Sequence, residues 1–397
     1  MVLTNEEITC QVDDINRYLI EVRRYLHENP ELSSVEYNTS KFLKDEVKKL
    51  GLSIYDVKGT GFYAILDTKR EGKTIGLRAD IDALPIYEND NNLINPRICK
   101  SKNDGVFHAC GHDGHMSILL ATMKILVDNI DKLKGRIIFI FEEGEETRSG
   151  IDSMIDALKN YNIDAIYGNH LASFLDTGEI CINSGPVMAG YARVDFTVKG
   201  KGGHGSRPDL SISPIFAAAN IITALSSAWV NRLDPNKTVT LGLGSINGGN
   251  IPNVIPNEVR VTGTLRYFDL DEGRKAIDLI KKVGTLTAMA HECEFIENDL
   301  SHHNSPVIND ENLANLMRKG ISDIMDSISI IETSWMASES FYKYSTICPT
   351  LFTLVGIKNE SLGSGAQHHN EYFDIDEDGL RIATIAMVKF ANDFLNS

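Results

Sequence analysis

The chain has 397 residues, of which 42% are hydrophobic and 24% are charged, a composition typical of soluble globular proteins. This length exceeds one ordinary core, so two domains are expected. The net charge of −16 would repel phosphate and excludes a nucleic-acid partner. Because no apolar run approaches the roughly 20 residues that a membrane helix needs, no membrane partner is expected either.

The cysteines and the start of the chain indicate a cytoplasmic protein. The start, "MVLTNEEITCQVDD", is acidic and polar, and it lacks the basic and apolar segments of a signal peptide. Reduced thiols are expected because the six cysteines show no disulfide-framework spacing. They are Cys10, Cys99, Cys110, Cys181, Cys293 and Cys348.

Helices and strands are predicted to alternate over the first part of the chain. Apolar residues recur at helical spacing through residues 15–26 and 43–50, and again after residue 117. Strands are predicted at 62–67, 74–80, 135–141 and 164–170, and a further helix is predicted near 147–158. Buried strands separated by amphipathic helices indicate a mostly parallel sheet between helices, which is an α/β fold.

The pattern changes near residue 190. Residues 191–200 alternate polar and apolar side chains, which is typical of a strand in a sheet with one face exposed to solvent. A helix over 212–230, strands at 238–246 and 258–268 and a helix over 271–290 follow, which together form an α+β unit of about a hundred residues. We therefore predict an α/β domain built from residues 1–187 and 299–397, with residues 188–298 inserted as a second domain.

Polar side chains cluster where the predicted strands end. Asp80 and Asp82 follow one strand, Glu145 and Glu146 follow another, and His170 ends a third. Because ligands bind at the carboxyl ends of the strands in an open α/β sheet, these side chains are expected to converge. Taken alone, the paired glutamates could equally be solvated groups at a helix N-terminus.

The stretch "FHACGHDGHMSILL" (107–120) adds Cys110 and His112, in a loop that precedes a helix. Its four ligand-type side chains lie too close in sequence to serve one tetrahedral ion. Together with the carboxylates and His170, this thiolate and imidazole mixture suits zinc or another divalent transition metal better than magnesium or calcium. A lone Cys-Gly-His is weak evidence, and it is the joint occurrence at strand ends that indicates a site.

Motifs along nearly the whole chain identify a family. They are "RRYLHENPELSSVE" (23–36), "LRADIDALPIYE", "HACGHDGHM", "GKGGHGSRP", "NVIP", "GTLR" and "HHNEYFDIDEDGL" (368–380), in family order. The chain resembles the aminoacylase, hippurate hydrolase and indole-acetyl-amino-acid hydrolase branch of the two-metal metallopeptidase and amidohydrolase family. The resemblance implies a zinc-peptidase-like α/β domain with an inserted α+β lid domain, and a homodimer formed through that lid.

The resemblance also implies a metal centre of two divalent ions, with zinc, manganese, cobalt or nickel all plausible. The ligands it implies are Cys110, His112, Glu146, His170 and His369. His368 is the alternative to His369, whose spacing to Phe373 matches the family. His108 and His115 are then expected to pack or to hydrogen-bond behind the ligands.

Further roles follow from the same resemblance. Glu145 is the implied general base, which takes the proton of a metal-activated water. His204 is the implied oxyanion donor, Asn253 and Arg266 are implied to hold the substrate carboxylate, and Asp82 is implied to orient a ligand.

The function implied is hydrolysis of the amide bond of small N-acyl-amino acids. Two alternatives stay open: a dipeptidase or carboxypeptidase on the same scaffold, and an inactive metal-binding scaffold, against which the presence of Glu145 argues. The chain departs from the family at "FEEGEE", where Glu142 and Glu143 replace uncharged residues. These glutamates could favour a cationic substrate, raise the pKa of the base or point into solvent.

Overall fold

The computed structural model describes residues 2–397, which form two compact units. The first unit comprises the chain through Val187 together with Ile308–Thr333 and Lys343–Ser397, and the second comprises Met188–Val307 and Ser334–Tyr342. The segment just after residue 298 belongs to the second unit, because β14 (His302–Asn304) pairs with β8 (Gly190–Lys199).

The first unit is built on an eight-stranded sheet with the order β1-β2-β4-β3-β5-β17-β6-β16. Its four middle strands run parallel, β1 and β2 pair antiparallel with their neighbours, and β6 is antiparallel to β17 but parallel to β16. The prediction of a mostly parallel sheet is confirmed. The strands are β1 (Ser53–Asp56), β2 (Phe62–Asp67), β3 (Thr74–Asp80), β4 (Arg136–Glu142), β5 (Ala165–Asp176), β6 (Glu179–Cys181), β16 (Ser329–Ile331) and β17 (Thr350–Lys358).

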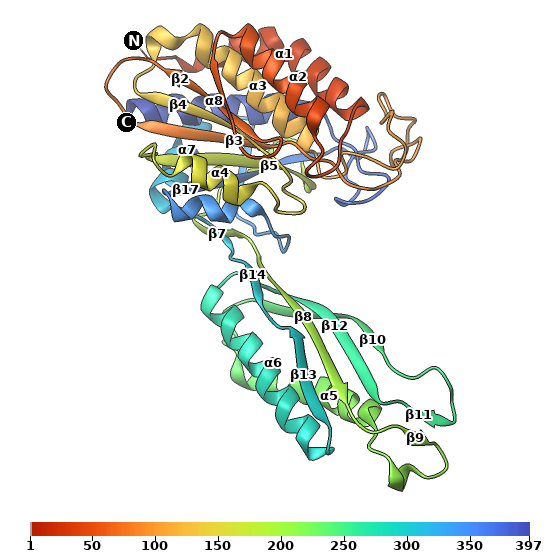
Figure 1. Cartoon of the computed structure of the whole chain (residues 1–397). Helices are drawn as coiled ribbons and strands as arrows, with labels where there is room; N and C mark the ends of the chain where they lie inside the picture. The colour runs from red at the N-terminus through yellow and green to blue at the C-terminus, as the bar shows by residue number, and fades with distance from the viewer. Residues whose placement is uncertain (1) are drawn as a thin grey trace. The chain divides into compact units, whose positions relative to one another are not determined.

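Helices α1, α3, α7 and α8 pack against one another, and α3 and α8 also contact the middle strands. Figure 1 shows α1, α2 and α3 side by side along the sheet. Nearly every side chain of α3 and α8 is buried, as expected for helices with neighbours on several sides. The helices are α1 (Asn5–Glu28), α2 (Tyr37–Lys49), α3 (His112–Asp128), α4 (Ile151–Leu158), α7 (Glu311–Ile324) and α8 (Asp378–Asn396), with short 3-10 turns at Ile130–Lys132 and Ser340–Thr346.

The second unit has an antiparallel sheet in the order β10-β12-β8-β13, to which β14 adds on β8. Helices α5 and α6 cover one face (Figure 1), where Val194, Phe196 and Val198 of β8 are fully buried. This is the α+β unit that the alternation in residues 191–200 predicts. Its elements are β10 (Val239–Asn247), β12 (Glu258–Tyr267), β13 (Glu294–Asp299), α5 (Pro214–Arg232) and α6 (Leu270–Ala290), with a 3-10 turn at Pro208–Leu210. Two further strand pairs are β9 (Gly203–His204) with β11 (Val254–Ile255), and β7 (Gly185–Met188) with β15 (Val307–Asn309).

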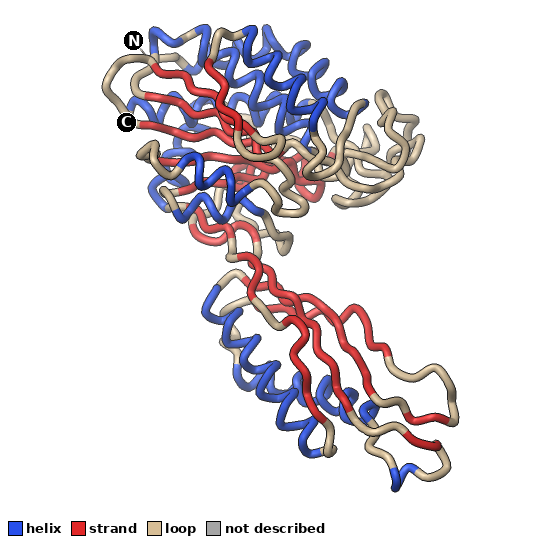
Figure 2. The backbone as a smooth tube through the Cα atoms, viewed as in Figure 1, coloured by secondary structure: helices blue, strands red, loops and turns tan. Residues whose placement is uncertain are grey.

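Long loops of the first unit gather at one end of its sheet (Figure 2). In Figure 1 they are the orange segment that follows β3 and the blue segment that follows β17. The two segments are joined by hydrogen bonds, since Asn92 donates to the Leu362 carbonyl at 2.9 Å and Arg97 donates to the Phe373 carbonyl at 2.8 Å. This pairing carries the C-terminal segment to the start of α3, where the His369 N–H donates to the Ala109 carbonyl at 2.9 Å.

No helix among residues 2–397 combines the length and the apolar character needed to cross a membrane.

Candidate metal centre

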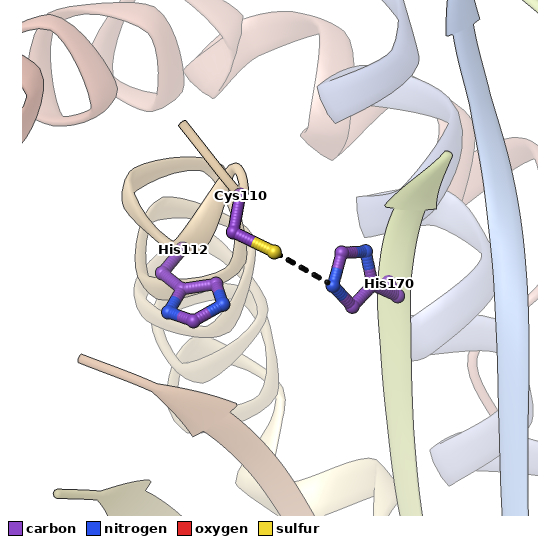
Figure 3. A group of neighbouring side chains, drawn as sticks. All are labelled: Cys110, His112 and His170. Carbon is purple, nitrogen blue, oxygen red and sulfur yellow. Dashed lines mark hydrogen bonds between the residues drawn. The ribbon is translucent and has the colours of Figure 1, made fainter. Parts of the chain in front are cut away.

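Three of the predicted ligands lie together at the carboxyl ends of the strands. Cys110 stands in the turn before α3, His112 is the first residue of α3, and His170 lies on β5 (Figure 3). The Cys110 sulfur lies 3.5 Å from Nε2 of His170, and one ligand atom from each of the three residues falls within 4.8 Å of the others. All three side chains are buried, and Gly111, which adopts the left-handed conformation at φ +85°, makes the tight turn between Cys110 and α3.

One ring nitrogen of His112 is hydrogen-bonded within the protein, and the other is available to a metal. Its Nδ1 lies 3.0 Å from the Asp82 carbonyl and 3.1 Å from Asp82 Oδ1, whereas the buried Nε2 has no hydrogen-bond partner. Burial lowers the pKa of His112, but the charges of Asp80, Asp82 and Glu146 outweigh it and raise the pKa to about 10. Carboxylates that draw a proton to a buried ring would equally attract a divalent cation, so this site fits a metal.

His170 is kept neutral by its surroundings. Its Nδ1 donates to the Leu171 carbonyl at 2.8 Å, which leaves Nε2 facing Cys110. Burial holds the pKa of His170 well below its ordinary value, and the neighbouring His115 and His368 rings lower it further. A neutral imidazole with its lone pair on Nε2 is the form that ligates a metal.

The three residues Cys110, His112 and His170 form one group of possible metal ligands, which we call a donor group. A second donor group also contains Cys110. Cys110, Glu146 and His369 also offer ligand atoms within 4.8 Å of one another, and Nε2 of His369 lies 3.2 Å from Oε1 of Glu146. A third group joins His112 to Glu145 and Glu146. The five predicted ligands and the predicted base therefore lie in overlapping groups, an arrangement that fits two neighbouring ions better than one.

In a fourth group, formed by Asp80, His112 and His115, the side chains of Asp80 and His115 are hydrogen-bonded to each other. Nδ1 of His115 lies 2.7 Å from Asp80, and its Nε2 accepts the Leu171 N–H at 3.0 Å. Because both ring nitrogens are used, His115 supports β5 beside His170.

The adjacent histidines of the C-terminal segment differ in role. Nε2 of His368 accepts the Ser173 N–H at 3.2 Å, and its ring packs edge-on against His170 with the centroids 5.2 Å apart. Only His369 of this pair belongs to a donor group. It adopts the left-handed conformation at φ +61°, and half of its side chain is exposed.

Glu145 and Glu146 lie in a turn and not at a helix N-terminus. The helix predicted from residue 147 begins only at Ile151, so the reading of the glutamates as helix caps is wrong. The physical reason is the turn at residues 143–150, in which Gly144 and Arg148 adopt left-handed conformations that a helix cannot contain.

Asp82 ties this turn to α3. Its Oδ2 accepts the Glu146 N–H at 3.1 Å while its Oδ1 contacts His112. Burial raises the pKa of Asp82, but the hydrogen bonds from His112 and Ser33 outweigh it and lower the pKa below its ordinary value. A single ionised carboxylate thus orients two predicted ligands.

The additional glutamates are buried parts of the fold. Glu142 accepts hydrogen bonds from Arg78 Nε at 2.9 Å and from the Tyr344 hydroxyl at 2.8 Å. Glu143 accepts the Thr60 N–H at 2.6 Å. The possibility that they point into solvent is excluded, and neither belongs to a donor group.

A buried network around Asp113, next to His112, is not predicted from the sequence patterns. Asp113 forms an ion pair with Arg23, whose Nε lies 2.8 Å from Oδ2, and Nδ1 of His27 lies 2.7 Å from the same oxygen. The other ring nitrogen of His27 lies 2.8 Å from Glu88. Burial and Arg23 lower the pKa of His27, but the two carboxylates outweigh them and raise it. The motif at 23–36 contains both basic residues and was the signal available.

His108 is buried, and neither of its ring nitrogens has a hydrogen-bond partner. Burial lowers the pKa of His108 to about 4, which keeps the ring neutral. Its predicted role in packing is compatible with this environment.

The other predicted residues belong to the second unit. His204 on β9 is exposed with its Nδ1 2.8 Å from the Ser206 hydroxyl, and Asn253 lies close by, because its carbonyl accepts the Gly205 N–H at 2.8 Å. Arg266 lies on β12 with its guanidinium 4.7 Å from the centre of the Tyr191 ring.

Known proteins are similar to this chain in sequence and in fold. Residues 76–393 match Peptidase family M20/M25/M40. The chain is 33% identical to thermostable carboxypeptidase 2 of Saccharolobus solfataricus, over 98% of this chain and 99% of that protein. It is 31% identical to N-acetyl-L-cysteine deacetylase of Bacillus subtilis, over 100% and 93% of the respective lengths.

A solved structure from Bacillus subtilis, YXEP, described as a dinuclear metal binding peptidase, superimposes with a TM-score of 0.83 at 28% identity and covers 97% of this chain and 99% of that one. The family resemblance predicted from the sequence motifs is confirmed by these similarities, which extend over both units. The chain is therefore a member of Peptidase family M20/M25/M40 and a hydrolase of amide bonds.

Proposed function

We propose that the protein is a two-metal amidohydrolase that releases an amino acid from an N-acyl-amino acid. Cys110, His112, Glu146, His170 and His369 are the residues proposed to hold the ions. The observation that carries the proposal is the overlap of the donor groups at Cys110, with Glu145 in the adjoining group. Two bound divalent ions would lower the pKa of a water molecule and polarise the amide carbonyl.

Glu145 is proposed to carry the proton. Glu145 is only 8% exposed, and its carboxylate lies in a donor group with His112 and Glu146. It takes one proton from the attacking water as the new C–O bond forms, and it returns that proton to the nitrogen as the C–N bond breaks. Asp82 takes no proton in this scheme and keeps the His112 ring and the Glu146 backbone in place.

The second unit is proposed to supply substrate contacts. His204 is proposed to stabilise the oxyanion, and Asn253 and Arg266 are proposed to bind the carboxylate of the substrate, a task that suits the forked donors of an Arg. The exposed position of His204 beside Asn253 supports this assignment.

Homodimerisation through the second unit is part of the proposal. Support comes from β10, the terminal strand of its sheet, because an edge strand can pair with a second copy. A cytoplasmic location is proposed as well, and it is supported by the absence of any disulfide among residues 2–397.

The experiment is a metal-reconstituted hydrolysis assay. Metal-free protein is loaded with zinc, manganese, cobalt or nickel and given a panel of N-acyl-amino acids, and the released amino acid is measured. The proposal predicts metal-dependent release, and Glu145→Gln lowers kcat by about 10²–10⁴-fold. The bound metal in this variant stays at the wild-type level, because Glu145 is not a proposed ligand.

A second candidate function is a carboxypeptidase or dipeptidase, which the similarity to thermostable carboxypeptidase 2 favours. The same panel decides between the two enzymes when dipeptides and N-blocked peptides are included. Release from peptides alone would replace the amidohydrolase by the peptidase. An inactive scaffold would bind metal while wild type and Glu145→Gln alike hydrolyse nothing.

A further inference from the structure

The turn at residues 143–150 carries both the proposed base and a proposed ligand, yet it belongs to no helix or strand. Two backbone hydrogen bonds close it from within, from the Arg148 N–H to the Glu145 carbonyl at 3.0 Å and from the Ser149 N–H to the Gly144 carbonyl at 3.1 Å. Hydrogen bonds from outside the turn also help to fix its backbone and, with it, the direction of the Glu145 side chain.

The N–H groups on either side of Glu145 are each held by a buried carboxylate. Oε1 of Glu36 accepts the Gly144 N–H at 2.9 Å, and Oδ2 of Asp82 accepts the Glu146 N–H at 3.1 Å. Asp82 is in turn fixed by the Ser33 hydroxyl at 2.6 Å. The segment 33–36, between α1 and α2, thus supports both sides of the base.

Glu36 has little room to move. Its side chain is fully buried, and its second oxygen accepts the Thr60 hydroxyl at 2.7 Å. At the other end of the bond, Gly144 has φ +59°, and a Cβ there would come within 2.0 Å of the Ser149 hydroxyl oxygen. The bond between Glu36 and Gly144 therefore joins a fully buried side chain to a position at which any side chain would clash.

The buried carboxyl group of Glu36 is unfavourable for the stability of the fold. No Lys or Arg among the described residues forms an ion pair with it, and burial raises its pKa to about 7. A buried carboxyl without a cation lowers stability, so its presence is better explained by the bonds it accepts than by a gain in stability.

We propose that Glu36 is a positioning residue for Glu145, acting through the Gly144 N–H and without touching substrate. The inference rests on the proposed function, in which Glu145 transfers the proton. A base displaced by about 1 Å loses on the order of 10²-fold in rate, so a single backbone hydrogen bond beside it is enough to matter.

The chain offers matched variants for the test. Glu36→Met removes the acceptor of the Gly144 N–H and keeps the volume, and Glu36→Asp withdraws the carboxylate from Gly144 but keeps the charge. Glu36→Gln is the conservative control, because its amide oxygen can accept from Gly144 while its NH₂ donates to Thr60. Thr60→Val removes the other bond of Glu36 and leaves the Gly144 bond intact.

Two readouts are taken on each folded, metal-loaded variant: kcat and KM for an N-acyl-amino acid, and amide hydrogen exchange over residues 143–150. We expect Glu36→Met and Glu36→Asp to lower kcat by about 10–100-fold at unchanged KM and bound metal, with faster exchange in the turn. Glu36→Gln and Thr60→Val stay close to wild type in both readouts.

Unchanged exchange in Glu36→Met or Glu36→Asp overturns the positioning role, whether or not the protein hydrolyses any substrate. An equal fall of kcat in Thr60→Val reduces Glu36 to a structural residue. If Glu36→Met does not fold, the result for Glu36→Asp alone decides whether Glu36 positions the turn. If the wild-type protein hydrolyses none of the substrates, the proposed function is refuted. Amide hydrogen exchange over residues 143–150 then still shows whether Glu36 holds the turn.

Discussion

Nδ1 of His112 lies 3.1 Å from Oδ1 of Asp82, so the ring nitrogen that remains for a metal is Nε2, which lies 3.9 Å from Oε1 of Glu146. The other oxygen of Asp82 holds the backbone of Glu146. One side chain therefore sets the distance between two proposed ligands that come from different parts of the chain.

Replacing Asp82 by Asn is expected to weaken metal binding by about 10–100-fold, the usual effect of losing a carboxylate that orients a ligating His. Asn offers one acceptor oxygen where Asp82 uses two. Competition with a chromophoric chelator measures the change. Ser33→Ala, which removes one hydrogen bond to Asp82, should give a smaller loss, and equal affinity of Asp82→Asn and wild type would contradict the orienting role.

Glu142→Gln tests the role of the additional glutamates. Because the variant removes one of two ion pairs of the buried Arg78, which keeps Asp80 at 2.8 Å, we expect a fall of about 2 kcal/mol in the free energy of unfolding, measured with denaturant. Tyr344→Phe, which removes only a hydroxyl from the same carboxylate, should cost about 1 kcal/mol. The ratio of rates on substrates with basic and neutral side chains should not change, and a shift in that ratio would restore the cationic-substrate interpretation.

The pH dependence of stability reports on Glu36. Its pKa is raised from an ordinary 4.5 to about 7 in the folded protein, so between these values the folded state holds a proton that the unfolded state has released. Wild type therefore loses stability relative to Glu36→Gln as the pH rises through this window. Unfolding of both proteins at about pH 5 and about pH 8 measures the effect, and parallel curves would show that Glu36 is ionised throughout.

Much of the first unit is predictable from local sequence patterns. Strands at 62–67 and 74–80 coincide with β2 and β3, because their apolar content marks them without reference to distant residues. The proposed metal ligands were recognisable because thiolate, imidazole and carboxylate groups stand where strands end, and the sheet brings those ends together.

The remaining features depend on contacts that local patterns do not encode. Glu36 and Gly144 are 108 positions apart, and Arg78 and Glu142 are 64 apart. The delayed start of α4 follows from the left-handed residues in the turn before it, one of which is Arg148, a residue type that gives no such signal. Which buried charges pair with each other depends on three-dimensional packing, and it cannot be predicted from the residue types alone.

The position of β17 has a consequence for biosynthesis. This strand lies between β5 and β6 in the sheet, and His369 follows it in the chain. A ribosome that has already translated the whole second unit therefore carries a nascent chain whose β5 has one bare edge and whose donor set lacks its last histidine. If His369 is a metal ligand, as proposed, the protein completes its metal centre only near the end of translation, and a product truncated before β17 would expose an edge of β5 and lack that ligand.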